Sequence, residues 1–341
     1  MDDGLSTRER ARRMIERELG SQLLDALHDP RTVELMLNAD GRLWCERVGQ
    51  GMECIGTFPS ARAEAIIKTV AGFHRKEITR QSPYLDGEFP LDGSRFAAQI
   101  PPIVPAPTFA IRKRAIAVFQ LEQYVEQGIM TAPQRDVLLT AIQTRRNILV
   151  VGGTGSGKTT LVNALIDTMM RTFPHLRMFI FEDTAEIQCR AENCVQYHTT
   201  VDVTMAKLLK ISMRMRPDTI LVGEVRGPEA LDVLMAWNSG HEGGIATLHA
   251  NNTRAGLSKL ALYISMNQDY PKPIEPLIAE AVQVVVHITR CADGRRVDDI
   301  LEVQGYEHGQ YITHSLCEPK ETHPCVPHRS GNKTCVSSAS C

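Results

Sequence analysis

The first segment of the chain carries hydrophobic residues at the spacing of an amphipathic helix. Over residues 6–28 the apolar side chains recur with the period of about 3.6 residues that marks one helix face. These side chains are Ala11, Met14, Ile15, Leu19, Leu23, Leu24 and Leu27. Ser6 or Thr7 suits the N-cap, because either hydroxyl can accept a hydrogen bond from a backbone N–H of the first turn. The other face is rich in arginine but includes glutamates, which favours a solvated face over contact with anionic lipid.

The next segment alternates polar and apolar residues and predicts an antiparallel unit. Asp-Gly pairs at 40–41 and 92–93 suit the positive φ angles of tight hairpin turns. Between the hairpins, residues 60–75 predict a helix. The proline-rich stretch 101–107 excludes regular helix and central strand and is expected to form a loop. Residues 107–114 then predict a closing strand.

The pattern changes after a helical stretch at about 119–145. Short strands of buried character now alternate with helices, which predicts a parallel sheet covered on both faces. The strands are expected within 147–151, 177–183, 219–225 and 243–250, and the helices within 161–170, 205–215 and 228–237.

This change of pattern predicts the domain organisation. We expect a smaller α+β N-terminal domain at 1–115, a linker at 116–131 and an α/β domain at 132–317. The tail at 318–341 is polar and without periodicity, and is expected to be disordered.

Composition restricts the class of protein further. The length of 341 residues agrees with roughly two domains. A net charge of −2 gives no global positive field to hold nucleic acid, so no direct sequence-specific nucleic-acid binding is expected. No apolar run approaches the roughly 18 residues of a membrane span, and no signal peptide is present, which predicts a cytoplasmic protein. The nine cysteines contain no C-x-x-C pair, which favours free thiols over a zinc site or disulfides.

One motif indicates the chemistry. Residues 152–159, GGTGSGKT, fit the phosphate-binding loop G-x-x-x-x-G-K-[ST], directly between a predicted strand and a predicted helix. In such a loop the backbone N–H groups and the helix N-terminus surround the phosphates. Lys158 is expected to reach the β- and γ-phosphates and Thr159 to hold Mg²⁺. The expected nucleotide-binding residues are Gly152, Gly153, Thr154, Gly155, Ser156, Gly157, Lys158, Thr159 and Thr160.

Hydrolysis also requires acids that hold the metal and polarise water. Glu182 and Asp183 end one predicted strand, and Glu224 ends another. Because ligands of an open parallel sheet bind at the carboxyl ends of its strands, these acids are expected to face the same crevice as the phosphate loop. Asp183 and Glu186 have an alternative role as caps of the next helix.

Four segments together resemble the secretion-type ATPases, the hexameric motors of type II and type IV secretion, type IV pili and conjugation. They are GGTGSGKTT, FIFEDTAEI, SMRMRPDTILVGEVRGPEA and GHEGGIATLHA, and the resemblance covers about residues 20–310. It implies a RecA-like P-loop NTPase domain with a mostly parallel sheet, preceded by the smaller N-terminal domain. The chain lacks the four-cysteine zinc module usual in the type II branch, so the resemblance favours the type IV branch.

The resemblance also implies roles for single residues. Glu182 would be the general base or position the attacking water, and Glu224 would bind Mg²⁺ through water, with the division between these two acids left open. His249, and by the same reasoning His241, would sense the γ-phosphate, since a neutral imidazole both donates and accepts a hydrogen bond. The alternative for each histidine is a structural role in the core.

A positive group that stabilises the transition state is expected from the N-terminal domain. The resemblance assigns it to Arg95 and Arg112; Lys113 and Arg114 extend this basic cluster, whose alternative is a solvated strand edge. A second set of arginines lies near the acidic strands and would act across a subunit boundary or pair internally with Asp218 and Glu224. This set comprises Arg214, Arg216 and Arg226.

The function that follows is a homohexameric, Mg²⁺-dependent ATPase that powers a type IV secretion or conjugative transfer apparatus, peripherally docked on inner-membrane channel proteins. ATP is the expected substrate. Alternatives from other classes are a GTPase switch, a nucleotide-gated DNA-binding adaptor and a small-molecule kinase. The only approximation to the guanine-reading N-K-x-D motif, at 332–335, lacks its acid, which argues against the GTPase.

Overall fold

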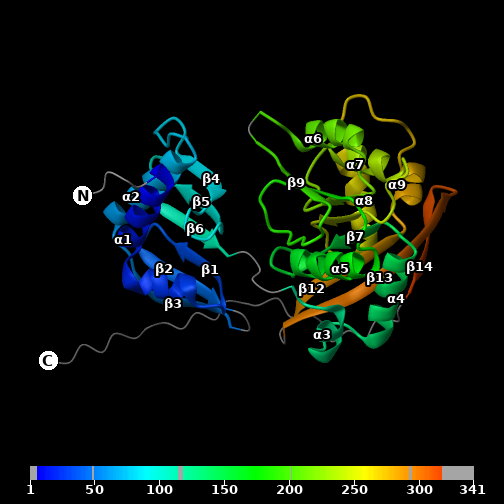
Figure 1. Ribbon diagram of the computed structural model, residues 1–341, viewed down its shortest axis with the longest axis horizontal. Helices are drawn as coiled ribbons and strands as arrows, with labels where there is room; N and C mark the ends of the chain where they lie inside the picture. The colour runs from blue at the N-terminus through cyan, green and yellow to red at the C-terminus, as the bar shows by residue number, and fades with distance from the viewer. Residues whose placement is uncertain (1–5, 48–49, 114–117, 201, 292–293, 317–341) are drawn as a thin grey trace.

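The structure, a computed structural model, describes residues 6–47, 50–113, 118–200, 202–291 and 294–316. Two sheets lie in separate halves of the molecule (Figure 1). The N-terminal sheet has the strand order β3-β2-β1-β6-β5-β4, and the C-terminal sheet has the order β14-β13-β12-β7-β11-β10-β8-β9. The linker expected at 116–131 lies between the two sheets in sequence, and its residues 121–126 form a helix that packs in the core of the C-terminal half. Residues 114–117 and 317–341 are outside the described residues, so Arg114 and the tail are too.

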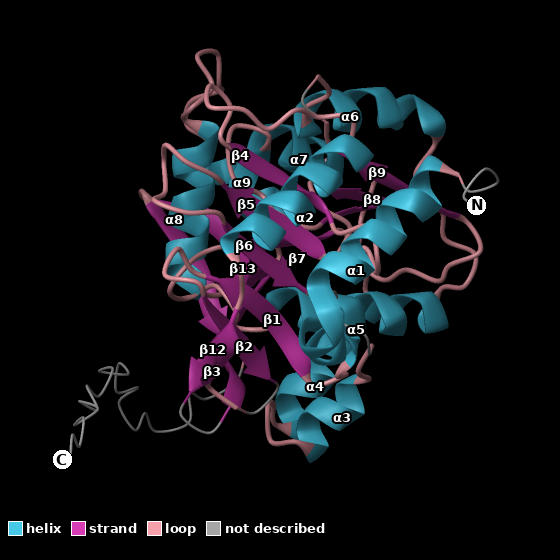
Figure 2. Ribbon diagram, turned by 90° about the vertical axis from the view of Figure 1, so that its left-hand side faces the viewer, coloured by secondary structure: helices cyan, strands magenta, loops and turns pink. Residues whose placement is uncertain are grey.

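The N-terminal sheet is wholly antiparallel and is covered by helices on one face. Its strands are β1 (Thr32–Leu37), β2 (Arg42–Arg47), β3 (Met52–Thr57), β4 (Tyr84–Glu88), β5 (Arg95–Gln99) and β6 (Thr108–Arg112). Figure 2 shows α1 (Thr7–His28) and α2 (Ser60–Phe73) side by side over these strands. Both predicted hairpins are confirmed, and β6 pairs with β1 and β5 in the middle of the sheet.

The helix predicted at the start of the chain is confirmed together with its cap. The Ser6 hydroxyl accepts a hydrogen bond from the backbone N–H of Glu9, whose carboxylate accepts one from the N–H of Ser6. This reciprocal pair satisfies two N–H groups that lack partners inside the helix. The apolar face then packs on the sheet, where Ile15, Leu19 and Leu23 are buried with the inward residues of β1, β5 and β6.

The C-terminal sheet is mostly parallel, as expected for this fold class. Strands β7 (Ile148–Val151), β8 (Met178–Glu182), β9 (Cys194–His198), β10 (Thr219–Val222), β11 (Ile245–Leu248) and β12 (Val284–Cys291) are paired in parallel. Strands β13 (Gly294–Glu307) and β14 (Gln310–Ser315) add an antiparallel edge, which makes the sheet mixed.

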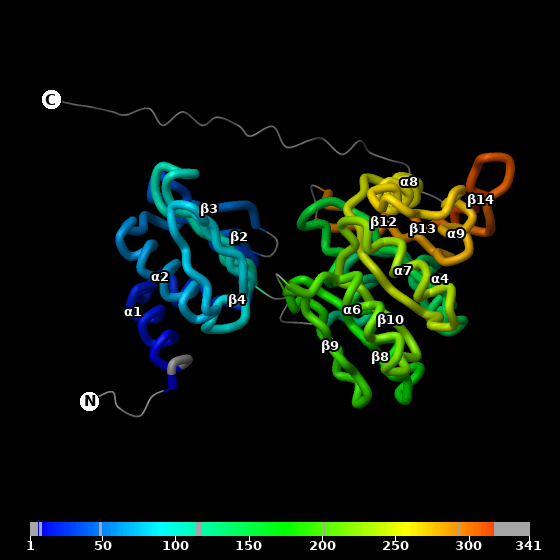
Figure 3. The backbone as a smooth tube through the Cα atoms, turned by 90° about the horizontal axis from the view of Figure 1, so that it is seen from above, coloured from blue at the N-terminus to red at the C-terminus, as the bar shows by residue number. Residues whose placement is uncertain are grey.

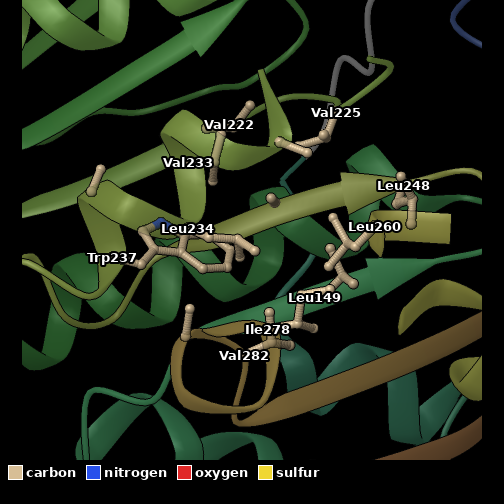
Figure 4. Packing of buried hydrophobic residues seen from close by; sticks show 14 of the residues in the cluster. Leu149, Val222, Val225, Val233, Leu234, Trp237, Leu248, Leu260, Ile278 and Val282 are labelled. Carbon is tan, nitrogen blue, oxygen red and sulfur yellow. The ribbon is translucent and has the colours of Figure 1, made fainter. Parts of the chain in front are cut away.

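Helices cover both faces of this sheet, so successive residues of β7 enter different cores. Ile148 and Val150 pack toward α3 (Leu121–Glu126), α4 (Ala132–Gln143) and α5 (Lys158–Thr172). Leu149 and Val151 pack toward α6 (Met205–Ser212), α7 (Ala230–Trp237), α8 (Thr253–Ile264) and α9 (Glu275–Ala281). Figure 4 shows Trp237 packed in that second core. Its indole N–H also donates to the carbonyl of Ile220 at 3.0 Å.

Two predicted boundaries differ from the structure. The helical stretch at 119–145 is two helices, because the chain turns at Gly128, whose φ is +69°, and a new helix starts at the Thr131 cap. The predicted helix at 205–215 ends at Ser212 and continues as the 3-10 turn η1 (Met213–Met215). Among the described helices, none combines the length and apolar character needed to cross a bilayer.

Candidate active site

The phosphate-binding loop connects β7 to the N-terminus of α5, as predicted. Gly157 is the N-cap of α5 and has a φ of +98°, a conformation that L side chains rarely adopt. Gly152 is required for a different reason: a Cβ there would lie 2.2 Å from the carbonyl oxygen of Ile288 on β12. The neighbouring sheet strand therefore fixes where the loop can run.

Lys158, the first residue of α5, is turned back into the loop. Its Nζ donates to the carbonyl oxygens of Gly152 and Gly153 at 3.0 and 2.9 Å, and lies 3.3 Å from Nδ1 of His249. Burial, together with the charges of Arg112 and Arg226, lowers the pKa of Lys158 to about 8 against the opposing pull of Glu224 and Glu186. An ammonium surrounded in this way gains stabilisation when phosphate oxygens arrive beside it.

His249 joins this lysine to the acid that ends the neighbouring strand. Its Nε2 lies 2.9 Å from Oε1 of Glu224, while its Nδ1 faces Lys158. Burial and the charge of Lys158 lower the pKa of His249. This favours the neutral imidazole, which donates through Nε2 to Glu224 and accepts through Nδ1 from Lys158.

Glu224 is held as a carboxylate by cations on two sides. Burial raises its pKa, but the hydrogen bond from Arg226 and the charges of Arg226 and Lys158 outweigh burial and leave the pKa below its ordinary value. Arg226 donates to Glu224 at 2.7 Å and lies 3.3 Å from Asp183. Of the two alternatives predicted for Arg226, the structure therefore shows internal pairing.

The acidic loop, residues 182–188, brings two glutamates to different environments. Glu182 is only 2% exposed, and its Oε1 accepts hydrogen bonds from the backbone N–H groups of Glu186 and Ile187 at 2.9 and 2.8 Å. Its side chain packs against Gly223, where an added Cβ would lie 2.9 Å from Cγ of Glu182. The glycine before Glu224 thus makes room for the acid of the neighbouring strand.

Glu186, in contrast, faces the phosphate loop. Its Oε2 accepts a hydrogen bond from the hydroxyl of Thr159 at 3.1 Å. The sequence offered capping of the next helix as the alternative to a functional role for this residue. Strands β10 and β11 lie between β8 and β7 in the sheet, so the contact of Glu186 with Thr159 depends on the path of the loop after β8.

Three further predicted residues lie in different places. Nδ1 of His241 lies 3.0 Å from the carbonyl oxygen of Ala236 at the end of α7. Arg95 pairs with Asp86 at 3.7 Å in the N-terminal sheet. Arg112 lies beside Arg95 on the adjacent strand, and its charge reaches Lys158 across the gap between the two halves.

The fold and this site define a class. A phosphate loop between a parallel strand and a helix, with acids at the ends of neighbouring strands, belongs to the RecA-like P-loop nucleotide-binding proteins. The solved structure of the pilus retraction motor PilT with bound ADP has the same fold, with a TM-score of 0.59 and 19% identity over 81% of this chain and 80% of that one.

The sequence comparisons identify the family. The chain belongs to the family described as Type II/IV secretion system protein, which matches residues 69–338. It is 45% identical to the probable conjugal transfer protein TrbB of Sinorhizobium fredii over 91% of this chain and 95% of that protein. It is 28% identical to the protein VirB11 of Agrobacterium fabrum over 82% of this chain and 90% of that protein. The resemblance to the type IV branch, and within it to TrbB, is confirmed.

Proposed function

We propose that this protein is a Mg²⁺-dependent ATPase that works as a homohexamer and powers a type IV secretion or conjugative transfer apparatus. The observation that carries the proposal is the placement of Lys158 between the carbonyls of the phosphate loop and the His249–Glu224 pair. This arrangement offers a triphosphate one cation, one neutral imidazole and one carboxylate at a single helix N-terminus.

Binding of ATP would replace the contacts that now hold the lysine. The Nζ group would exchange the carbonyl oxygens of Gly152 and Gly153 for phosphate oxygens. His249, freed on its Nδ1 side, would bind a proton from solvent there and donate it to a γ-phosphate oxygen in a hydrogen bond, while its Nε2–H keeps Glu224 in place. The state of the phosphate would thereby be communicated to Glu224 and Arg226.

The donor set near the loop suits Mg²⁺, a hard cation that takes oxygen ligands and keeps several waters. The hydroxyl of Thr159 and the carboxylates of Glu186 and Glu224 would hold it, directly or through water. When bound it would neutralise charge on the phosphates.

The identity of the general base stays a prediction, and the two candidates are Glu186 and Glu224. The sequence left the general base open between Glu182 and Glu224, but the carboxylate of Glu182 is held by backbone N–H groups. Glu186 contacts Thr159 and lies closer to the expected place of the phosphates. We therefore propose that Glu186 or Glu224 orients the attacking water and that Glu182 holds the acidic loop.

Arg112 would supply the positive charge that stabilises the transition state, with Arg95 beside it. The effect of Arg112 on the pKa of Lys158 supports this, because the γ-phosphate would lie between these two cations. Attraction to the phosphate would draw the two halves together, and hydrolysis would release them.

The relatives support the proposed role in the cell. Proteins of 45% and 44% identity are named as conjugal transfer proteins. By the same reasoning we propose inner-membrane channel proteins as partners, a peripheral position on the cytoplasmic side, and no direct sequence-specific binding of nucleic acid.

The test is turnover of ATP and GTP by the purified chain, combined with light scattering with and without a non-hydrolysable ATP analogue. We expect ATP hydrolysis that Lys158→Ala abolishes and a hexamer with the analogue. Lys68→Ala is the control, because Lys68 pairs with Glu64 on the exposed side of α2. Preference for GTP, retention of DNA without hydrolysis, or a monomer under both conditions would contradict the proposal.

A further inference from the structure

Five charged residues form a row across the N-terminal sheet. Strand register places each opposite the next: Glu46 on β2 faces Glu34 on β1, Glu34 faces Arg112 on β6, Arg112 faces Arg95 on β5, and Arg95 faces Glu88 on β4. Residues directly opposite each other in an antiparallel sheet point to the same face. The charged row, as we call these five residues, therefore shares one face although its members are far apart in the sequence.

This face is turned toward the C-terminal half. The alternate residues of the same strands, including Leu35, Phe96 and Ile111, are fully buried under α1 and α2. Figure 3 shows both helices on the far side of the sheet from the C-terminal half, and Figure 1 agrees. An ion pair of 3.2 Å between Arg290 on β12 and Glu46 at one end of the charged row connects the two halves.

Glu34 is the second residue of the charged row, next to Arg112 at its centre. It lies between Glu46, whose charge it repels, and Arg112, whose charge it attracts. Burial raises the pKa of Glu34 and the charge of Arg112 acts against burial, which is the effect expected of an adjacent cation. Because Glu46 pairs with Arg290, it does not compete with Glu34 for Arg112.

The two arginines of the row are held differently. Arg95 is paired with Asp86, whereas the acid directly opposite Arg112 is Glu34. An arginine side chain has many rotamers, and a carboxylate on the neighbouring strand restricts them without removing the charge. An arginine so restricted needs less reorganisation when a phosphate arrives.

We propose that Glu34 is the positioning residue for Arg112 and holds its guanidinium toward the γ-phosphate end of the phosphate loop. The proposal rests on the proposed function, in which Arg112 meets the phosphate. Glu34 itself touches no substrate and acts only through Arg112. Loss of Glu34 should therefore weaken the binding of a triphosphate, whose γ-phosphate Arg112 meets, and leave the binding of a diphosphate unchanged.

The experiment compares Glu34→Gln, Glu34→Asp, Arg112→Ala and the double variant Glu34→Gln/Arg112→Ala in the full chain. We expect Glu34→Gln to lower kcat about tenfold. Calorimetry should show a lower affinity for a non-hydrolysable ATP analogue and an unchanged affinity for ADP. Glu34→Asp recovers part of the loss. In the Arg112→Ala background Glu34→Gln has no further effect, because the group it positions is gone. Glu64→Gln on α2 is the control, and thermal unfolding of each variant reports its folding.

Each other outcome has a distinct meaning. The inference would be overturned if Glu34→Gln lowered the affinities for ADP and for the ATP analogue equally, or if it lowered kcat about tenfold again in the Arg112→Ala background. Either result would show that Glu34 only supports the sheet. If Lys158→Ala abolished turnover but Arg112→Ala did not, the role of Arg112, and the inference with it, would be wrong while the ATPase stood. If no variant turned over ATP, the wild type included, the proposed function itself would fail.

Discussion

The two sheets of this protein place their chemistry in different ways. In the C-terminal sheet, β7, β10 and β11 are buried along their whole length, so the polar groups lie where the strands end. In the N-terminal sheet, β6 alternates between buried and half-buried residues, and the charges lie across the strands on one face. A strand covered on both sides can offer chemistry only at its ends, whereas a strand covered on one side can offer it along its length.

The largest expected effect tests whether the N-terminal sheet takes part in the reaction. Arg112→Ala should lower kcat about 10³-fold, because a transition-state arginine contributes on that order. Arg95→Ala should cost less, since Arg95 is paired with Asp86. Steady-state turnover measures both. Equal, small losses would mean that the charged row is only a surface of the sheet and that the C-terminal sheet works alone.

The next largest effect distinguishes the roles of Glu182 and Glu186, the two glutamates at the end of β8 and in the loop after it. Glu186→Gln should lower kcat about 10²-fold, the usual contribution of an acid or base that acts on the reacting groups, with little change in thermal stability. Glu182→Gln should lower thermal stability more than Glu186→Gln does, because it replaces a buried acceptor of two backbone hydrogen bonds. Steady-state turnover and thermal unfolding are measured on both variants. If Glu182→Gln folded normally and had the lower kcat of the two, the roles of Glu182 and Glu186 would be exchanged.

A third prediction concerns the packing that fixes the phosphate loop. Gly152→Ala should reduce the free energy of unfolding by about 1–3 kcal/mol, since its Cβ would meet the carbonyl of Ile288 at 2.2 Å. Gly153→Ala is the matched control, because no atom lies within 4 Å of the Cβ that it would add. Denaturant unfolding compares them. Equal stability of the two variants would mean that the loop moves freely relative to β12.

The smallest expected effect is the pH dependence of nucleotide binding. With a pKa of about 8 in the free protein, Lys158 is protonated at pH 7 and mostly neutral at pH 9. Phosphate favours the ammonium, so binding at pH 9 must take up a proton, and affinity for Mg²⁺·ATP should fall about tenfold between pH 7 and pH 9. Calorimetry in buffers of different ionisation enthalpy would detect the uptake. Lys158→Arg, which stays protonated, should remove the pH dependence; its persistence there would assign the proton to another group.

Much of the fold could be predicted from periodicity, but its edges could not. The buried, largely apolar strands β7, β8, β10 and β11 and the first helix have strong local signals. Strand β9 alternates half-buried and exposed residues, and its pairing with β8 was not apparent in that pattern. The separation of α3 from α4 depends on one backbone angle at Gly128, which a run of helix-forming residues conceals.

The sequence by itself determined the phosphate loop, because its glycines, lysine and helix N-terminus are adjacent and need no distant contact to act. It also located the strand-end acids, since parallel strands bring their carboxyl ends to one edge. Only the tertiary structure decided that Glu182 turns inward while Glu186 meets Thr159, because side-chain direction depends on the packing around Gly223. It alone placed Glu34 beside Arg112, since strand register joins residues that the chain keeps far apart.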